Sequence, residues 1–244
     1  MTKNRTDLLL YYNSLSFRKQ KNRPHFYTSF VSTLDGKIFV KKPGYWPIGS
    51  ATDYEVFTLL RAHADIIIDG KNTACAFGKH TIETIHSPSF RKLRKKLKKS
   101  EQVEYGVISS HPDEALVRAM QNTYDFKPLL LTSDNVDALV YHNYFKAERI
   151  FSETEDRLTS LVSFLHKSGY ENVFIDGGPT LLASFVEKKI LDAVFLTLAP
   201  KIFGSEGGTT LTLVEGKLFD PKETAHYTLI HSAVEGDEVF LHYT

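Results

Sequence analysis

The sequence predicts an α/β protein with a mostly parallel central sheet, flanked by helices and carrying an antiparallel hairpin at the C-terminus. Two observations lead to this fold class. From about residue 25 onward, short apolar and β-branched runs alternate with segments of helical spacing, which is the order of strand–helix–strand units around a parallel sheet. The last two apolar runs, 227–232 and 239–243, have no helical segment between them, which predicts the hairpin.

The first part of the chain predicts a short helix and then a bent strand. Four leucines between positions 8 and 15 indicate a helix in an N-terminal helical extension, residues 1–23, which ends in a basic connector. The stretch FYTSFVSTLDGKIFV that follows is interrupted by Asp35-Gly36. It predicts strand, turn and strand, or one strand with a tight corner. We expect residues 24–244 to form a single domain, because no repeat or low-complexity linker divides them.

The remainder of the chain alternates between the two patterns. The segments expected to be strands are 66–68, 105–109, 128–132, 172–175 and 193–198. The segments expected to be helices are 52–63, 113–120, 153–167 and 179–188. Ser50 or Thr52 is the expected cap of the first of these helices, because hydroxyls just before a helical pattern accept hydrogen bonds from its first N–H groups.

Composition and charge exclude several classes of protein. The 244 residues are 42% hydrophobic and 24% charged, and the formal net charge of +1 gives no general attraction to nucleic acid or membrane. Cys75 is the only cysteine, so a disulfide framework and a multi-cysteine zinc site are excluded, and no histidines are spaced for a metal. The apolar stretch 8–12 is too short for a signal-peptide core or a membrane span. We expect a cytoplasmic protein.

One basic run, Arg91 to Lys99, departs from this balance. A run of this kind can attract RNA or another anionic surface. We favour a solvated helix face or a mobile excursion between two strands, because no aromatic residue is interleaved in the run and acidic residues balance it elsewhere.

A glycine-marked turn, Asp176-Gly177-Gly178-Pro179-Thr180, follows the apolar run VFI and opens a helical pattern. In open α/β sheets, ligands bind at the carboxyl ends of strands, where such loops lead into helices. Glycines there let backbone N–H groups approach an anion, and the N-terminus of the helix adds partial positive charge. A plain tight turn from strand to helix explains the same residues, and both readings stay open at this point.

A second loop, Asp69-Gly70-Lys71-Asn72-Thr73, also follows a buried strand. A glycine, a cation and a hydroxyl within four residues can hold a phosphate. Two loops of this kind on one sheet suggest a nucleotide with a pyrophosphate, although the chain lacks the Gly-x-Gly-x-x-Gly of the usual dinucleotide fold. Thr132 and Ser133 end the run PLLLT-S, where their hydroxyls could meet a ribose 2′-phosphate, which favours NADPH over NADH.

Three stretches together resemble a known family: STLDGKI at residue 32, IGSATDYEVFTLLRAHADIIIDGKNTA at residue 48, and VFIDGGPTLLASFVEKKILDAVFLTLAPKIFG at residue 173. They are similar to the C-terminal reductase domain of RibD proteins of riboflavin biosynthesis, which has a dihydrofolate-reductase-like fold. The resemblance covers roughly residues 25–205. It implies a homodimeric, NADPH-dependent reductase that transfers hydride to the ribosyl C1 of a ribosylaminopyrimidine phosphate.

The resemblance also implies roles for individual residues. Asp35 and Lys37 lie in the corner expected near the nicotinamide and are the catalytic candidates, while Arg61 and Asp176 match substrate-binding positions. The expected cofactor contacts are Gly70, Thr73, Gly177, Gly178, Pro179, Thr180 and Leu181, together with Thr132 and Ser133. The alternatives are a reductase of another small heterocycle or carbonyl and a non-catalytic nucleotide-binding module. Asp176, Asp35 and water all stay open as the source of the proton.

Overall fold

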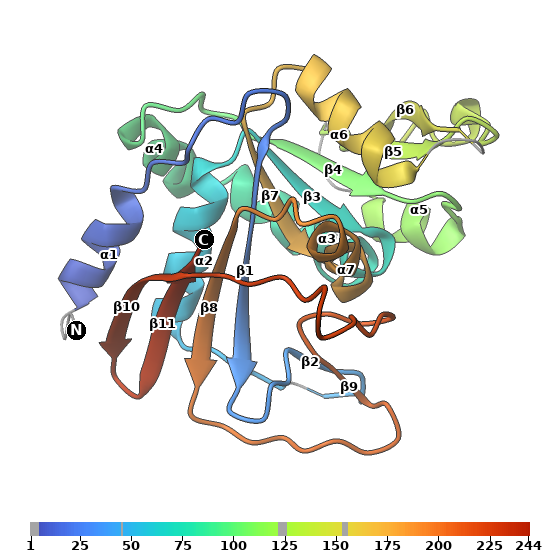
Figure 1. Cartoon of the computed structure of the whole chain (residues 1–244). Helices are drawn as coiled ribbons and strands as arrows, with labels where there is room; N and C mark the ends of the chain where they lie inside the picture. The colour runs from blue at the N-terminus through green and yellow to red at the C-terminus, as the bar shows by residue number, and fades with distance from the viewer. Residues whose placement is uncertain (1–4, 45, 122–125, 153–155) are drawn as a thin grey trace. The chain divides into compact units, whose positions relative to one another are not determined.

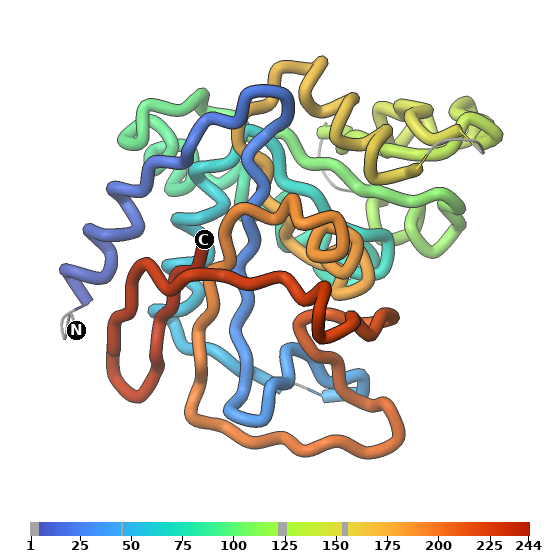
Figure 2. Tube along the Cα trace, in the orientation of Figure 1, coloured from blue at the N-terminus to red at the C-terminus, as the bar shows by residue number. Residues whose placement is uncertain are grey.

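The computed structural model describes residues 5–44, 46–121, 126–152 and 156–244. The chain divides into two compact units, whose elements are labelled in Figure 1. Unit 1 comprises Met1–Ser16, Phe26–Leu60 and Pro179–Thr244, and unit 2 comprises Phe17–His25 and Arg61–Gly178. The chain therefore passes between the units more than once, and Figure 2 traces its path. The domain limits expected from the sequence, 1–23 and 24–244, stay a prediction.

Unit 1 contains a mixed sheet in the order β10-β11-β8-β1 and a separate two-stranded sheet, β2-β9. Its elements are α1 (Arg5–Asn13), β1 (His25–Thr33, from Phe26 on), β2 (Phe39–Val40), α2 (Ala51–His63, up to Leu60), α7 (Pro179–Glu187), β8 (Ala193–Ala199), β9 (Thr210–Leu211), β10 (Leu229–Glu235) and β11 (Glu238–Tyr243). β1 and β8 are parallel, whereas β10 and β11 form an antiparallel pair. The hairpin expected at the C-terminus is confirmed.

The segment after β1 is a corner, as the Asp35-Gly36 pair predicts, but no hairpin follows it. Gly36 has φ +78, which is accessible to glycine and strained for other residues. β2 then pairs with β9. Of the two forms expected for this stretch, strand, turn and strand is therefore confirmed, although the second strand is short and does not pair with the first.

The N-terminus of α2 is capped by one of the two hydroxyl residues expected from the sequence. Oγ of Ser50 accepts from the backbone N–H groups of Thr52 and Asp53, at 3.1 and 3.2 Å. Glu238 of β11 in turn accepts from the N–H and the hydroxyl of Ser50, at 2.8 and 2.6 Å. Ser50 is therefore the cap, and the C-terminal hairpin holds the cap in place.

Unit 2 is built on a parallel sheet in the order β7-β3-β4-β5-β6. Its elements are the last turn of α2, β3 (Ile66–Gly70), α3 (Lys71–Ile85), α4 (Pro88–Lys96), β4 (Glu104–Ile108), α5 (Glu114–Met120), β5 (Leu129–Ser133), η1 (Ala138–Val140), β6 (Lys146–Phe151), α6 (Arg157–Lys167) and β7 (Asn172–Gly177). The central strands are buried along nearly their whole length, as parallel strands covered on both faces must be. Of the predicted helix 153–167, residues 153–155 lie outside the described residues.

Three elements of unit 2, β6, α3 and the short η1, were not expected from the sequence. β6 is an edge strand whose residues, apart from Phe151, are exposed or partly exposed, so its apolar pattern is weak. α3 begins immediately after β3, where we expected a loop, and it packs against β3 and β4.

The basic run forms most of α4, and one of its residues is not solvated. Arg94 is 1% exposed and donates hydrogen bonds to the carbonyl oxygens of Ala62, Ala64, Ser100 and Gln102 and to the Ser100 hydroxyl. The expectation of a solvated face holds for the exposed Arg91, Lys92, Lys95 and Lys96 and is wrong for Arg94. Across the described ranges, no helix is long and apolar enough to cross a lipid bilayer.

Candidate functional site

Arg61 and Asp176, the two expected substrate ligands, meet inside unit 2. Arg61 belongs to the last turn of α2 and Asp176 to the end of β7. NH2 of Arg61 donates to Oδ2 of Asp176 and also to Oγ1 of Thr81, at 3.0 Å. The exposed fractions of the two side chains are 5% for Arg61 and 2% for Asp176. The two residues thus form a buried ion pair, and their contact with a substrate stays a prediction.

A second buried carboxyl, Asp69 of β3, belongs to the same cluster, and we assigned it no role from the sequence. Its Oδ2 accepts a hydrogen bond of 2.7 Å from the hydroxyl of Tyr105 in β4. Burial raises the pKa of Asp69, and the charge of Asp176 raises it further. Burial also raises the pKa of Asp176, and Arg61 opposes that shift. The acid within the apolar run IIID was the signal that could have drawn attention to this position.

The expected phosphate loop after β3 is a direct junction between a strand and a helix. Gly70 has φ −73 and ψ 156, an extended conformation, and no side chain caps the helix that begins at Lys71. The first N–H groups of a helix have no partner within it, so an uncapped N-terminus favours an anion. Lys71 is paired with Asp113 at 2.8 Å. The loop therefore offers backbone N–H groups, while its cation is already engaged.

Thr73 and Gly177, two of the expected cofactor residues, are brought together. A Cβ atom on Gly177 would stand 2.4 Å from Cγ2 of Thr73 and 2.9 Å from its Oγ1. The next glycine, Gly178, has φ +101, a conformation that residues with a side chain rarely adopt. Glycine is thus needed at the two positions for different reasons. At Gly177 the side chain of Thr73 leaves no room for a Cβ atom, and at Gly178 the backbone has a positive φ.

The expected residues after β5 are divided between the interior and the surface. Thr132 is completely buried, whereas Ser133 is partly exposed. Beyond the carboxyl ends of β4 and β5 lies a hollow of about 320 Å³, lined by residues 110–112, 135–137, 140 and 141. Ser110 and His111 were not predicted, although polar residues at the end of a buried strand are the signal that marked Ser133. Ser133 is therefore better placed than Thr132 to meet a ligand.

In unit 1, Asp35 is held by the corner in which it lies. Its carboxylate accepts from the Thr33 hydroxyl at 2.5 Å, from the Gly204 N–H at 2.7 Å and from the Phe203 N–H at 3.3 Å. The Thr33 hydrogen bond and then those of the two backbone groups lower the pKa of Asp35. A carboxylate stabilised in this way is a poor proton donor near neutral pH.

Lys37 and the first turn of α7 both adjoin the segment 212–216 of unit 1. Hydrogen bonds from Thr212 lower the pKa of Glu215, and the charges of Lys41 and Lys37 lower it further. The N–H of Glu215 donates to the carbonyl oxygen of Pro179 at 3.4 Å. Thr180 and Leu181, which follow Pro179 in α7, are exposed and partly exposed.

Comparison with known proteins shows the family. The model of the RibD C-terminal domain matches residues 24–239, which is most of the chain. The chain therefore belongs to the RibD C-terminal domain family, and the resemblance seen in the sequence is confirmed.

Individual relatives carry more specific names. The chain is 25% identical over 199 residues to a 2,5-diamino-6-ribosylamino-4(3H)-pyrimidinone 5′-phosphate reductase of Archaeoglobus fulgidus, which covers 81% of this chain and 89% of the relative. It is 22% identical over 184 residues to the riboflavin biosynthesis protein RibD of Aquifex aeolicus, covering 75% of this chain and 48% of that protein.

Solved structures support the fold. A pyrimidine reductase-like protein of Corynebacterium diphtheriae has a TM-score of 0.65 and 19% identity, with 91% of this chain and 92% of that chain covered. The riboflavin biosynthesis reductase of Saccharomyces cerevisiae has a TM-score of 0.61 and 13% identity, with 97% of each chain covered. The predicted α/β fold class with a mostly parallel sheet is confirmed.

Proposed function

We propose that this protein is an NADPH-dependent reductase that transfers hydride to the ribosyl C1 of a ribosylaminopyrimidine phosphate in riboflavin biosynthesis. The observation that carries the proposal is the family match over residues 24–239, together with a relative named for this reaction. Bound NADPH would supply the hydride. The protein therefore has to bind both reactants, orient them and exclude water from them.

The residues of unit 2 fit a pyrophosphate. The uncapped start of α3 presents N–H groups next to Thr73, and Gly177 keeps the space beside Thr73 clear of a side chain. In the proposal, Gly70, Thr73, Gly177 and Gly178 of unit 2 hold the cofactor. The cofactor roles of Pro179, Thr180 and Leu181, which belong to unit 1, stay a prediction. Ser133 and the hollow after β4 and β5 are the proposed contacts of its adenosine end.

The buried pair Arg61 and Asp176 is proposed for the substrate side, and Lys37 for the corner near the nicotinamide. Asp35 serves there as an ionised group that orders the corner, because three donors stabilise its carboxylate. Asp35 is therefore the least suitable of the open proton sources.

The test is NADPH oxidation, followed by nicotinamide absorbance, with a panel of acceptors. We expect turnover with the ribosylaminopyrimidine phosphate. Turnover only with another heterocycle or carbonyl would support the first alternative, and binding of NADPH without turnover on any acceptor would support a nucleotide-binding module. Calorimetry should give a lower Kd for NADPH than for NADH, and Ser133→Ala should weaken NADPH more than NADH. An equal or lower Kd for NADH would contradict the cofactor preference.

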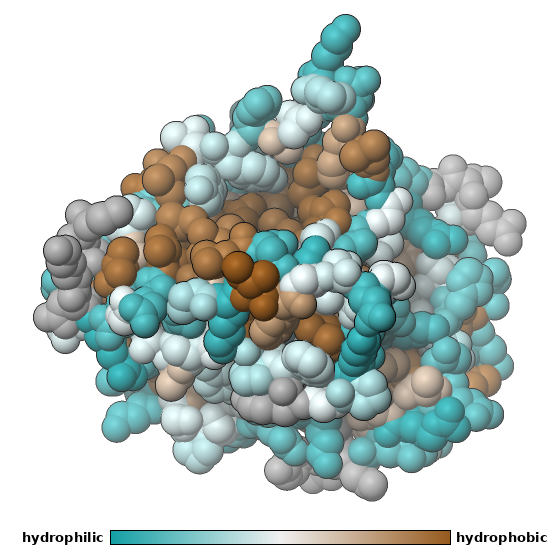
Figure 3. All heavy atoms as spheres, turned by 90° about the horizontal axis from the view of Figure 1, so that it is seen from below, coloured by the Kyte–Doolittle hydropathy of each residue, from teal (hydrophilic) through white to brown (hydrophobic). Residues whose placement is uncertain are grey.

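We also propose a homodimer in the cytoplasm. β10 is at the edge of its sheet, and its first residues, Leu229 and Ile230, are 48% and 54% exposed. We infer the dimer from the resemblance and from the C-terminal hairpin alone, because the strand that contains Phe195 to Leu198 lies between β1 and β11 and offers no edge. Apolar side chains gather on the face that Figure 3 draws. An uncovered apolar edge strand is a surface that proteins usually cover.

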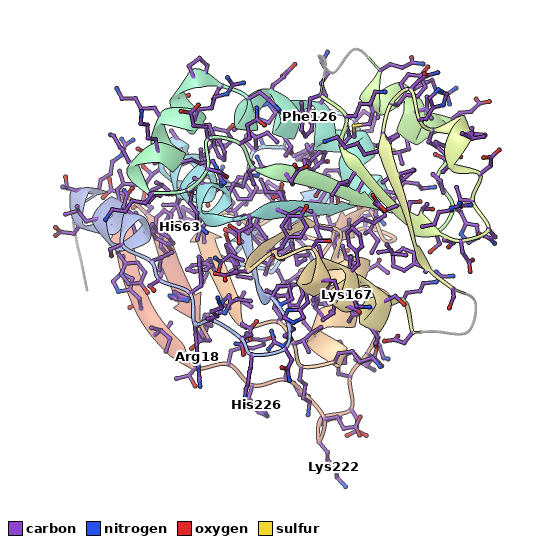
Figure 4. All side chains as sticks on the ribbon, turned by 90° about the horizontal axis from the view of Figure 1, so that it is seen from above. Arg18, His63, Phe126, Lys167, Lys222 and His226 are labelled. Carbon is purple, nitrogen blue, oxygen red and sulfur yellow. The ribbon has the colours of Figure 1, made fainter. Side chains whose placement is uncertain are left out.

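Sedimentation velocity at micromolar concentration tests the dimer. Ile230→Lys should shift the protein toward monomer. Leu218→Lys changes a residue that is 96% exposed in the same unit, in the segment between β9 and β10 from which Lys222 extends outward in Figure 4. This control should leave the dimer intact. A wild-type monomer would refute the proposal.

A further inference from the structure

The buried cluster of unit 2 contains more carboxyl groups than cationic groups. Asp69 and Asp176 are both buried, and Arg61 is the cation whose charge acts on them. Among the described residues, the hydroxyls of Tyr105 from β4 and Thr81 from α3 also contact the cluster. Two ionised carboxylates with one guanidinium would leave a buried negative charge without compensation, which is strongly unfavourable.

The sheet places these two acids next to each other. β3 and β7 are paired in register at Ile68 and Ile175, but the next pair is Asp69 with Gly177. Asp176 is therefore the extra residue of a β-bulge, a distortion that re-aims a side chain. The bulge allows Asp176 to reach Arg61 while Asp69 stays in the regular part of its strand.

Hydrogen bonding also divides the four carboxyl oxygens into two kinds. Oδ2 of Asp176 accepts from Arg61, and Oδ2 of Asp69 accepts from Tyr105. Oδ1 of each acid is buried and has no hydrogen-bond partner within the part of the chain that the structure describes. One proton held by Asp69 and directed to Asp176 would satisfy both of these oxygens at once, and would also remove the excess charge.

The surroundings make room for this arrangement. Gly78 lies inside α3, where glycine lowers helix stability. A Cβ atom at this position would stand 2.9 Å from the hydroxyl of Tyr105 and 2.4 Å from Cε of Met120. The helix thus leaves space for the tyrosine that orients Asp69.

We infer that Asp69 is a positioning residue that carries the proton of an Asp69–Asp176 pair, so that Asp176 stays ionised and aligned on Arg61. The inference rests on the proposed function in one respect, that Asp176 and Arg61 serve the substrate. Ionisation of Asp69 at alkaline pH places a second negative charge beside Asp176. The two carboxylates then compete for Arg61, and the alignment of Asp176 on Arg61 weakens.

Infrared difference spectroscopy of the full chain without substrate tests the proton itself. We expect a protonated carboxyl stretch at pH 7 that disappears on alkaline titration and is absent in Asp69→Asn. The matched control is Asp65→Asn, which changes a partly exposed acid just before β3 that pairs with Lys99. It should keep the band. Absence of a protonated carboxyl at pH 7 in the wild type, or its persistence in Asp69→Asn, would overturn the inference.

The pH profile of kcat/KM with the ribosylaminopyrimidine phosphate tests the positioning role. The wild type should lose at least tenfold on the alkaline side as Asp69 ionises. Asp69→Asn, which imitates the protonated acid, should lose this decline, and Asp65→Asn should keep it. Tyr105→Phe should move the decline to higher pH, because its hydrogen bond favours the ionised form of Asp69. Identical profiles for the wild type and Asp69→Asn would overturn the role. If no acceptor is turned over, the proposed function fails, whereas the infrared result still decides where the proton lies.

Discussion

Thr73 and Gly177 lie so close together that a Cβ atom on Gly177 would stand 2.4 Å from Cγ2 of Thr73. The contact joins the first turn of α3 to the end of β7 within unit 2. These two places correspond to the two loops that the sequence marked as phosphate sites. The glycine is therefore required by a neighbouring side chain, independently of any ligand.

Gly177→Ala should consequently destabilise the protein by about 1–3 kcal/mol through overpacking. In Thr73→Ala the Cγ2 and Oγ1 atoms are removed, so the double variant should recover part of the loss. Denaturant unfolding of the wild type, the two single variants and the double variant gives the coupling energy between the two positions. Strictly additive losses of stability would show that Cβ of residue 177 and the side chain of Thr73 do not clash.

Gly178→Ala should weaken both the fold and NADPH binding. Its φ of +101 makes any side chain strained, at a cost of about 1–3 kcal/mol. Lower stability alone therefore does not distinguish a plain turn from a cofactor cradle.

Gly169→Ala is the matched control for Gly178→Ala. Gly169 also has a positive φ, +81, and a Cβ there would meet nothing within 4 Å. Both variants should melt early, but only Gly178→Ala should raise the Kd for NADPH once the folded fraction is taken into account. Normal NADPH binding by Gly178→Ala would assign the glycine to the turn.

Arg94→Ala should be severely destabilising, by about 3 kcal/mol or more, because buried carbonyl groups lose a charged donor. Arg91→Ala removes an exposed arginine of the same helix and should change stability by less than about 0.5 kcal/mol. Chemical denaturation of both variants makes the comparison. Similar losses of stability in the two variants would indicate that the hydrogen bonds of Arg94 do not stabilise the end of α2 and the segment that follows α4.

Arg94 also illustrates what a sequence pattern can predict about this fold. Apolar runs such as 66–68 and 172–175 mark buried strands directly, since burial on both faces leaves little choice of residue. Nine consecutive residues rich in lysine and arginine give no sign of which cation turns inward. That choice depends on four carbonyl groups from two other segments, which only the tertiary fold brings together.

The candidate site shows the same division. Glycines and polar residues after strands led to the prediction of Thr73, Gly177 and Ser133, because loops at the carboxyl ends of parallel strands share one edge of the sheet. Their contact with a cofactor stays a prediction. The pairing of Arg61 with Asp176 and the burial of Asp69 beside them depend on a β-bulge and on the packing of α3. The bulge and the packing of α3 have no local signal in the sequence, whereas the acid in the apolar run IIID does mark Asp69.

Asp53 provides a test of pH dependence within unit 1. Burial is the main cause that raises its pKa from 3.8 to about 6; the charge of Glu238 adds to the shift, and a hydrogen bond with Thr197 opposes it. The folded protein therefore binds the Asp53 proton more tightly than the unfolded chain does. The contribution to stability is fully present below about pH 4 and is lost as the pH rises through about 6.

Asp53→Asn should remove this loss, so that at pH 7 the variant is more stable than the wild type by about 2 kcal/mol. Below pH 4 the two proteins should differ little, because Asp53 is then protonated in both states. Urea unfolding at a series of pH values between 4 and 7 measures the effect, with the exposed Glu223→Gln as the control that keeps the wild-type slope. If Asp53→Asn lowers stability at pH 7, the ionised carboxylate is stabilised by its hydrogen bond with Thr197 more than it is penalised by burial and by Glu238.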